Sequence, residues 1–229
     1  MKFKRTFAAL ITAVSVLSLT ACGKDEQPTV SNGGTGTQPS GNNSFSPSGG
    51  EGYLQGLNEQ EIALEIERTH VRSCDSTAQS LLNVTKTYIA DYEYNVWYEN
   101  SGGGLFREAG VLAEITVVNG EPTVKMNGYN DTAVTEKVGT YEDFIKEGFG
   151  FTSEDNCKAV IYAKKNGMPC ACVYSDRADA KLGNYEYDED NDKIIVRVEW
   201  VSEDLPGVTP DGFYIGTYPK ADSKGTLTA

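Results

Sequence analysis

Residues 58–94 read NEQEIALEIERTHVRSCDSTAQSLLNVTKTYIADYEY, and this stretch decides the fold. Asn58 and Glu61 have the spacing of a capping box, in which the side chain before a helix accepts hydrogen bonds from the first helical N–H groups. No Gly or Pro occurs between positions 57 and 100. The pattern therefore predicts one long helix that begins after Asn58 and runs to about Tyr94.

Residues with apolar or small side chains recur along this segment at spacings of three and four, which places them on one stripe of a helix. The stripe predicts the face that packs on the rest of the domain. The Ser and Asp residues at 73–76 mark the place where the helix would break. The stripe consists of Ile62, Ile66, His70, Cys74, Ala78, Leu81, Leu82, Thr85, Tyr88, Ile89 and Tyr92.

The chain after the helix has the pattern of strands and turns. Asn119-Gly120 and Asn166-Gly167 each predict a hairpin, because Asn-Gly favours the positive φ angles of a two-residue turn. Thr140 caps a predicted short helix that runs to about Glu147 and ends at Gly148. A long helix followed by an antiparallel sheet predicts an α+β domain in which the helix covers one sheet face. The predicted strands are residues 111–118, 122–126, 157–165, 168–175, 185–189, 193–200 and 213–218.

The first residues of the chain carry an export signal. Three basic residues precede an apolar run over residues 7–19, which is too short for a transmembrane helix. The run ends in Leu19-Thr20-Ala21-Cys22, which resembles the lipobox of bacterial lipoproteins. In that family the Cys thiol receives a diacylglyceryl group, so the resemblance implies that Cys22 anchors the protein in the lipid bilayer, at the outer face of the cell membrane. The alternative is an ordinary secretory signal with an incidental Cys.

The composition divides the chain into three regions. Residues 1–21 are the predicted signal peptide, residues 22–56 the lipidated N-terminus and a linker, and residues 57–229 a single α+β domain. The linker is rich in Gly, Ser and Thr and has too little apolar surface to offset the entropy lost on folding, so we expect it to be disordered.

The charge of the chain excludes one class of partner. The sequence has 20 basic and 33 acidic residues, a net charge of −13. Removal of residues 1–21 takes away three basic residues and no acidic one, which lowers the net charge to −16. A strongly acidic protein repels phosphate backbones, so a nucleic-acid partner is not expected.

The globular part resembles the soluble domains of Gram-positive type IV pilin-like proteins. The resemblance is carried by Ala78-Gln79-Ser80-Leu81-Leu82, by the small-residue hairpin and by Ile215-Gly216-Thr217-Tyr218-Pro219. It implies a long helix packed on an antiparallel sheet over residues 58–220. Type IV pilins polymerise through an apolar N-terminal helix, and this chain has a lipobox and a linker in its place. The resemblance therefore implies the fold without implying a filament.

The second predicted hairpin carries three of the cysteines. If Asn166-Gly167 forms a two-residue turn, Ile161 faces Cys172 and Ala163 faces Cys170. One sheet face then presents mainly small side chains to the helix. That face consists of Cys157, Ala159, Ile161, Ala163, Cys170, Cys172 and Tyr174.

Two interpretations of the cysteines stay open. Cys74 on the helix is within the predicted reach of Cys170 or Cys172, and an extracytoplasmic location permits such a disulfide. Alternatively, the thiols are free and behave as small hydrophobic residues. Cys157 lies too far along its strand to join Cys170 and Cys172 in one site, so we do not expect a zinc centre.

Two further features invite a functional interpretation. His70 is the only histidine, and its helical neighbours predict a packed position rather than a catalytic one. Asp188, Asp190 and Asp192 supply the hard oxygen ligands of a calcium site, although the segment lacks the spacing of an EF-hand, and a solvated hairpin turn is the alternative.

These observations predict a cell-surface lipoprotein whose domain is a non-catalytic binding or structural module, with no cofactor. Aromatic residues near positions 92–98 and in the last strands predict a packed core and, on the surface, a patch suited to a cell-wall glycan or a protein partner. One alternative is a glycan-directed hydrolase that uses paired carboxylates. Another is a solute-capture lipoprotein, for which the domain is short.

Overall fold

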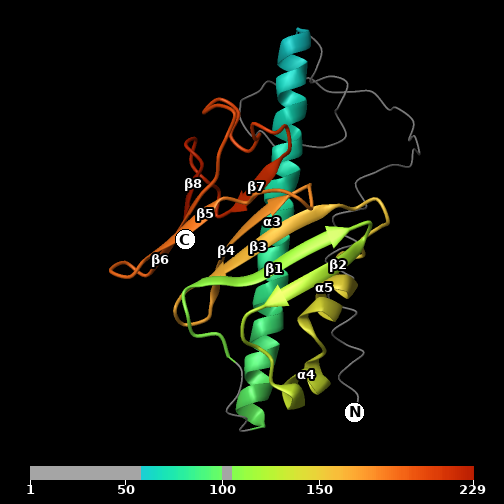
Figure 1. The fold of residues 1–229 in the computed structure, drawn as a ribbon, viewed down its shortest axis with the longest axis vertical. Helices are drawn as coiled ribbons and strands as arrows, with labels where there is room; N and C mark the ends of the chain where they lie inside the picture. Colours follow the sequence, from blue (N-terminus) through green and yellow to red (C-terminus); the bar gives the residue numbers. More distant parts are fainter. Residues whose placement is uncertain (1–57, 100–104) are drawn as a thin grey trace, which may run out of the picture. The chain divides into compact units, whose positions relative to one another are not determined.

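The structure, a computed structural model, describes residues 58–99 and 105–229 (Figure 1). By its internal contacts the chain divides into residues 1–62 and residues 63–229. The predicted lipobox and linker lie outside the described residues. Residues 63–229 form an α+β unit with a long helix and two antiparallel sheets, which confirms the predicted fold class.

Helix α3 (Glu59–Tyr98) is continuous over 40 residues, as the capping box and the absence of Gly and Pro predict. The Asn58 side chain accepts hydrogen bonds from the N–H groups of residues 60 and 61, and the Glu61 carboxylate accepts one from the Asn58 N–H at 2.8 Å. The helix does not break at residues 73–76. Hydroxyl groups in the following turn donate to carbonyls of this segment, so they add to the helical hydrogen bonds rather than compete with them.

The larger sheet has five antiparallel strands in the order β2-β1-β3-β4-β7. The predicted turn at Asn119-Gly120 is confirmed, because both residues have positive φ angles and Val118 pairs directly with Glu121. The five strands are β1 (Gly110–Val118), β2 (Glu121–Met126), β3 (Cys157–Ala163), β4 (Pro169–Ser175) and β7 (Ile215–Tyr218).

The hairpin between β3 and β4 is wider than predicted. Ile161 pairs with Cys172, as expected, but the register shifts after Tyr162 and Ala163 then pairs with Pro169. The predicted pairing of Ala163 with Cys170 is wrong. A proline has no N–H for a regular ladder, and a strand accommodates it at an irregularity of this kind.

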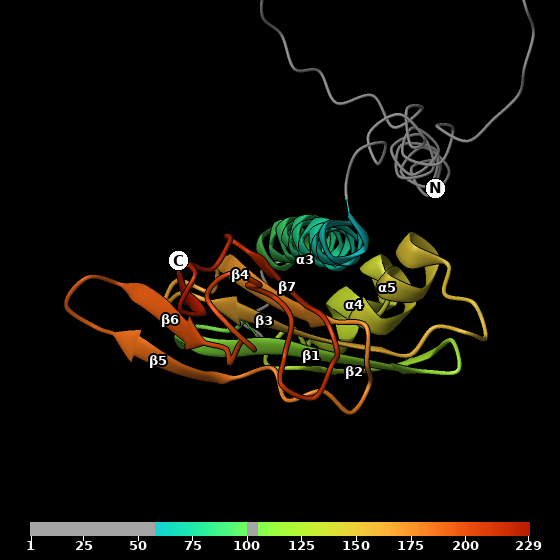
Figure 2. The ribbon, with the colours of Figure 1, turned by 90° about the horizontal axis from the view of Figure 1, so that it is seen from above.

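A second sheet has three strands in the order β5-β6-β8, and the sequence did not predict it as a separate layer. Its members are β5 (Asn184–Asp188), β6 (Lys193–Arg197) and β8 (Thr226–Thr228). β8 was missed because three residues after Gly225 are too short to show an alternating pattern. Figure 2 shows β5 and β6 projecting beyond one end of the five-stranded sheet, and buried residues of β6 pack on the sheet face opposite to α3.

Two short helices lie on the same side of the larger sheet as α3 (Figure 2). Helix α4 (Thr132–Val138) was not predicted, although Asp131 caps it by accepting hydrogen bonds from two N–H groups. Helix α5 (Tyr141–Phe149) begins after Thr140 as predicted. It runs past Gly148 and ends at Gly150, which has the left-handed conformation of a helix C-cap.

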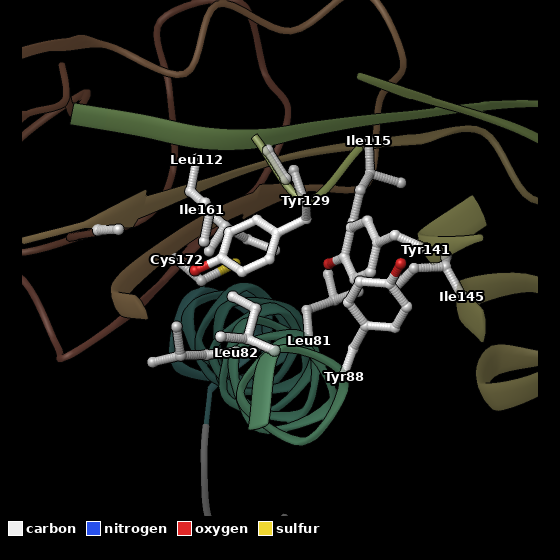
Figure 3. Packing of buried hydrophobic residues seen from close by; sticks show 14 of the residues in the cluster. Leu81, Leu82, Tyr88, Leu112, Ile115, Tyr129, Tyr141, Ile145, Ile161 and Cys172 are labelled. Atoms are coloured by element: carbon white, nitrogen blue, oxygen red, sulfur yellow. The ribbon is translucent and has the colours of Figure 1, made fainter. Parts of the chain in front are cut away.

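The two faces of the five-stranded sheet bury different kinds of side chain. The face toward α3 packs leucines, small residues and tyrosines, several of which Figure 3 shows between the helix and the strands. The opposite face packs mostly aliphatic residues of the smaller sheet and the final segments. The sheet therefore forms the central layer between helices on one side and a second sheet on the other.

Helix α3 and the edge strand β7 approach each other closely at Gly216. A Cβ atom at this position would overlap the backbone of Cys74 and Asp75. Asp75 also accepts a hydrogen bond from the Thr217 N–H at 2.8 Å, and Lys220 lies 3.4 Å from its carboxylate. The contact positions the helix against the edge of the sheet through backbone rather than through long side chains.

The buried stripe of α3 begins later than predicted. Ile66 is 51% exposed and His70 is also exposed, while burial starts at Val71 and continues to Val96. β7 meets the helix at residues 74 and 75, so the preceding turns have no strand to pack against. The periodicity of a helix shows which side is apolar, but it does not show how far the opposing sheet extends.

Candidate functional site

The last turns of α3 carry an exposed group of aromatic side chains, which we call the aromatic cluster: Tyr94, Trp97 and Tyr98. Their exposed fractions are 60%, 74% and 65%. The ring centroid of Tyr94 lies 6.4 Å from that of Trp97 and 6.3 Å from that of Tyr98. Five of the nine large hydrophobic side chains that are exposed in the described residues lie on α3, so the cluster is the densest such surface on this helix.

Helix geometry explains why these rings face outward. Tyr92 and Val96 belong to the same turns and are buried against the domain, and residues two positions away point in roughly the opposite direction. The rings at 94, 97 and 98 are neighbours because residues three and four apart share a helix face. The cluster is therefore held on a rigid element whose other side is part of the core.

Several contacts hold this end of α3 in place beside α4 (Figure 1). The Tyr92 hydroxyl accepts a hydrogen bond from the Asp131 N–H at 2.6 Å. Glu99 forms an ion pair with Lys137 of α4, and Glu93 forms one with Arg107 at 3.1 Å. Arg107 in turn donates to the carbonyl of Asn166 at 2.7 Å, which connects the helix end to the β3–β4 turn.

Asp91 and Asn95 border the aromatic cluster. The Asn95 side-chain nitrogen donates to the Asp91 carbonyl at 2.8 Å and approaches its carboxylate at 3.4 Å. Asp91 takes part in no ion pair among the described residues. Burial raises the pKa of its carboxyl above the ordinary value. The rings therefore lie beside an exposed carboxylate that can accept further hydrogen bonds.

The four cysteines within the described residues are separate thiols. Burial, with the nearby charges of Asp176 and Asp75, raises the pKa of Cys74 to about 12, and burial raises the pKa of Cys157 and of Cys170 to about 11. Protonated thiols are poor nucleophiles and poor metal ligands. Their environment is that of small hydrophobic residues, the second of the two interpretations.

The predicted position of Cys170 on the helix-facing side of the sheet is wrong. The irregularity at Pro169 turns this residue toward the opposite cluster, where its thiol donates to the Tyr162 carbonyl at 3.5 Å. Cys157 and Cys172 pack on the helix-facing side as expected. A disulfide between Cys74 and Cys172 stays a prediction, and a count of four free thiols under denaturing, non-reducing conditions would exclude every disulfide in the domain.

The acidic turn between β5 and β6 uses its carboxylates for local hydrogen bonds. Asp188 accepts from the backbone and the side chain of Asn191, which lowers its pKa, and Asp192 accepts from the Tyr187 hydroxyl at 2.8 Å. Across the part of the chain that the structure describes, no group of three or more His, Cys, Asp or Glu has metal-binding geometry. These contacts favour the solvated turn, and calcium binding by Asp188, Asp190 and Asp192 stays a prediction.

His70 is packed, as predicted, but it lies on the surface rather than in the core. Its ring stacks on Tyr214 at a centroid distance of 4.8 Å and an interplanar angle of 15°. Tyr214 is further held by its N–H, which donates to Asp176 at 3.1 Å. The histidine therefore attaches an exposed turn of α3 to the segment that leads into β7.

Comparison with protein-family models, with curated proteins and with solved structures finds no match to this chain. Within residues 58–99 and 105–229, no helix is long and apolar enough to cross a membrane. The aromatic cluster and its surroundings are the features of the described residues that point to a function.

Sequence reasoning identified the tyrosines and the tryptophan near the helix end but not which of them are exposed. It also missed Asp91 and Asn95. The signal was present in the spacing, since positions 91, 94, 95 and 98 share a helix face on which no aliphatic residue occurs.

Proposed function

We propose that this chain is a membrane-anchored cell-surface lipoprotein whose α+β domain is a non-catalytic binding module, with the aromatic cluster as its binding surface. The observation that carries the proposal is the outward display of Tyr94, Trp97 and Tyr98 on a helix that the core holds rigid. Exposed Trp and Tyr side chains bury much area on binding and lose little conformational entropy, which makes them effective anchors.

Binding is better supported than hydrolysis at this surface. Glycoside hydrolysis requires two carboxyl groups on either side of a bond, one of them with a raised pKa. Among the described residues, Asp91 is the only carboxylic acid whose pKa is raised, and the side chain that contacts it is the Asn95 amide. A hydrolase that uses paired carboxylates is the alternative proposal, and conversion of a glycan to shorter products would establish it.

The anchor part of the proposal rests on the lipobox sequence. Substitution Cys22→Ala should release the protein into the medium or leave it unprocessed. Correctly processed Cys22→Ala protein that stays in the membrane would contradict the assignment. The packing of a long helix on an antiparallel sheet also supports a pilin-like fold for the domain, and display on a lipid anchor would replace assembly through an N-terminal helix.

A co-sedimentation experiment tests the binding module. The purified full chain is mixed with cell walls from the producing bacterium, and the bound fraction is compared for the wild type, Trp97→Ala and Met168→Ala. Met168 is the matched control, because it is 61% exposed but lies outside α3. We expect Trp97→Ala to lose at least tenfold in binding and Met168→Ala to bind normally. Equal binding by all three proteins would refute the cluster as the binding surface.

A further inference from the structure

The two tyrosines of the aromatic cluster have ring planes within 21° of parallel, with centroids 6.3 Å apart. The Trp97 ring lies at a similar distance from Tyr94 and is tilted by 41°. The three exposed rings together offer flat apolar surface at the helix end. The C–H face of a pyranose ring packs on an aromatic face of this kind.

The polar groups beside the rings accept hydrogen bonds. The Asn95 side-chain nitrogen is engaged with the Asp91 carbonyl, which leaves the Asn95 side-chain oxygen and the Asp91 carboxylate as acceptors toward solvent. Asp91 and Asn95 lie on the same helix face as Tyr94 and Tyr98, so a ligand on the rings would reach both acceptors. The surface therefore needs a ligand that brings its own donors, and sugar hydroxyl groups are such donors.

The charges around the cluster disfavour an anionic ligand. Arg107 and Lys137, the cations that the described contacts place at this helix end, are each paired with a glutamate. The chain as a whole has a net charge of −13, which repels polyanions. A cationic ligand would also be attracted by aromatic faces beside a carboxylate, and the oligolysine probe below tests that outcome.

We infer that the aromatic cluster binds a neutral glycan, an uncharged chain of pyranose sugars whose ring faces stack on Tyr94, Trp97 and Tyr98 while its hydroxyl groups donate to Asp91 and Asn95. The inference rests on the proposed function, because it names the ligand class of the same surface. The binding free energy comes from stacking and from hydrogen bonds, and the ligand carries no charge, so the affinity depends little on salt.

Tryptophan fluorescence and calorimetry test the inference. Trp200→Phe removes the other tryptophan, so emission from the purified full chain then reports Trp97. The probes are β-1,4-linked hexamers of N-acetylglucosamine, glucose and mannose, with poly(glycerol phosphate) and oligolysine as charged controls. We expect at least one neutral hexamer to give a saturable change that 0.5 M NaCl leaves within about twofold. The charged polymers should give no saturable change.

Calorimetry measures the affinity of variants made in the wild-type chain, which keeps Trp200. Trp97→Ala should weaken binding of the responding hexamer by at least tenfold, and Asp91→Asn by about fivefold, because the amide replaces an acceptor by a donor. Met168→Ala should bind normally. A failure of all three hexamers, or salt-sensitive binding of oligolysine or poly(glycerol phosphate), overturns the inference. If cell-wall binding still depends on Trp97 in that case, the ligand is of another class and the proposed function stands.

Discussion

Tyr88 and Tyr92 lie on the inner side of α3, whereas Tyr94 and Tyr98 lie on the outer side of the same helix, within three turns. The inner pair is almost fully buried, and both hydroxyl groups are hydrogen-bonded to the segment that carries α4 and α5. The outer pair is more than half exposed, with rings near each other. The comparison teaches that a tyrosine packs in the core where its hydroxyl group bonds to the domain and lies exposed where, within the described residues, no such bond is found.

On the inner side of α3, substitution should cost the most stability where the backbone of β7 touches the backbone of the helix. Gly216→Ala places a methyl group against the backbone of Cys74 and Asp75, so we expect a loss of about 3 kcal/mol or more in the free energy of unfolding. Gly148→Ala is the matched control. Gly148 lies within α5, and a Cβ atom there would meet only the Val84 side chain of α3, at 3.9 Å. It should be neutral or stabilise by up to about 1 kcal/mol. Urea unfolding measures the stability of both variants, and equal values would contradict the close approach of β7 to α3 at Gly216.

Alkaline pH should lower the free energy of unfolding through Cys157, a thiol of β3 that is buried in the core beneath α3. Burial raises the pKa of Cys157 from 9.0 to about 11, so the folded protein keeps a proton that the unfolded chain loses above pH 9. Stability is then unaffected below pH 9 and falls as pH rises toward 11, on the order of 2 kcal/mol for this thiol. Urea unfolding between pH 8 and pH 11 measures the fall, and Cys157→Ala should make it smaller. A flat profile over this range would argue against buried free thiols.

The two tyrosine pairs can be compared by removing single hydroxyl groups. Tyr92→Phe leaves the Asp131 N–H without its acceptor at a partly buried site, so we expect a loss of about 1 to 2 kcal/mol in the free energy of unfolding. Tyr98→Phe should change it by less than about 0.5 kcal/mol, because this side chain is 65% exposed. The comparison fails if the two variants lose stability equally.

The smallest effect on stability is expected at the most exposed ring. Trp97→Ala should shift the free energy of unfolding by less than about 0.5 kcal/mol, since the side chain is 74% exposed. The same substitution should weaken cell-wall binding at least tenfold, so the variant separates a core role from a surface role of aromatic residues on α3. A large loss of stability would show that Trp97 belongs to the core.

The sequence predicts which helices and turns form in this fold more clearly than how the strands pair. The capping box at Asn58 and the Asn119-Gly120 turn are local signals, and both predictions are confirmed. The shift after Tyr162, which turns Cys170 to the other face, depends on how Pro169 fits beside β3 and has no local signature. The separate three-stranded sheet depends on pairing between β6 and the last residues of the chain, which periodicity does not show.

For a similar reason, the sequence predicted the aromatic residues of the candidate site but not their exposure. Tyr94, Trp97 and Tyr98 are evident as aromatic residues, but exposure depends on which side of the helix the sheet covers. The core side is fixed by long-range contacts such as the one between Cys74 and Gly216. Asp91 and Asn95 became candidates only when the outward side of the helix was known.

The edge strand β7 has two outward N–H groups that are occupied by partners within the chain. The N–H groups of Thr217 and Ile215 donate to the Asp75 side chain and to the Gly207 carbonyl, both at 2.8 Å. A neighbouring strand that met this margin would find these two donors already occupied, which disfavours strand addition there. The Asp75 carboxylate on the long helix thus also protects part of this edge against strand addition.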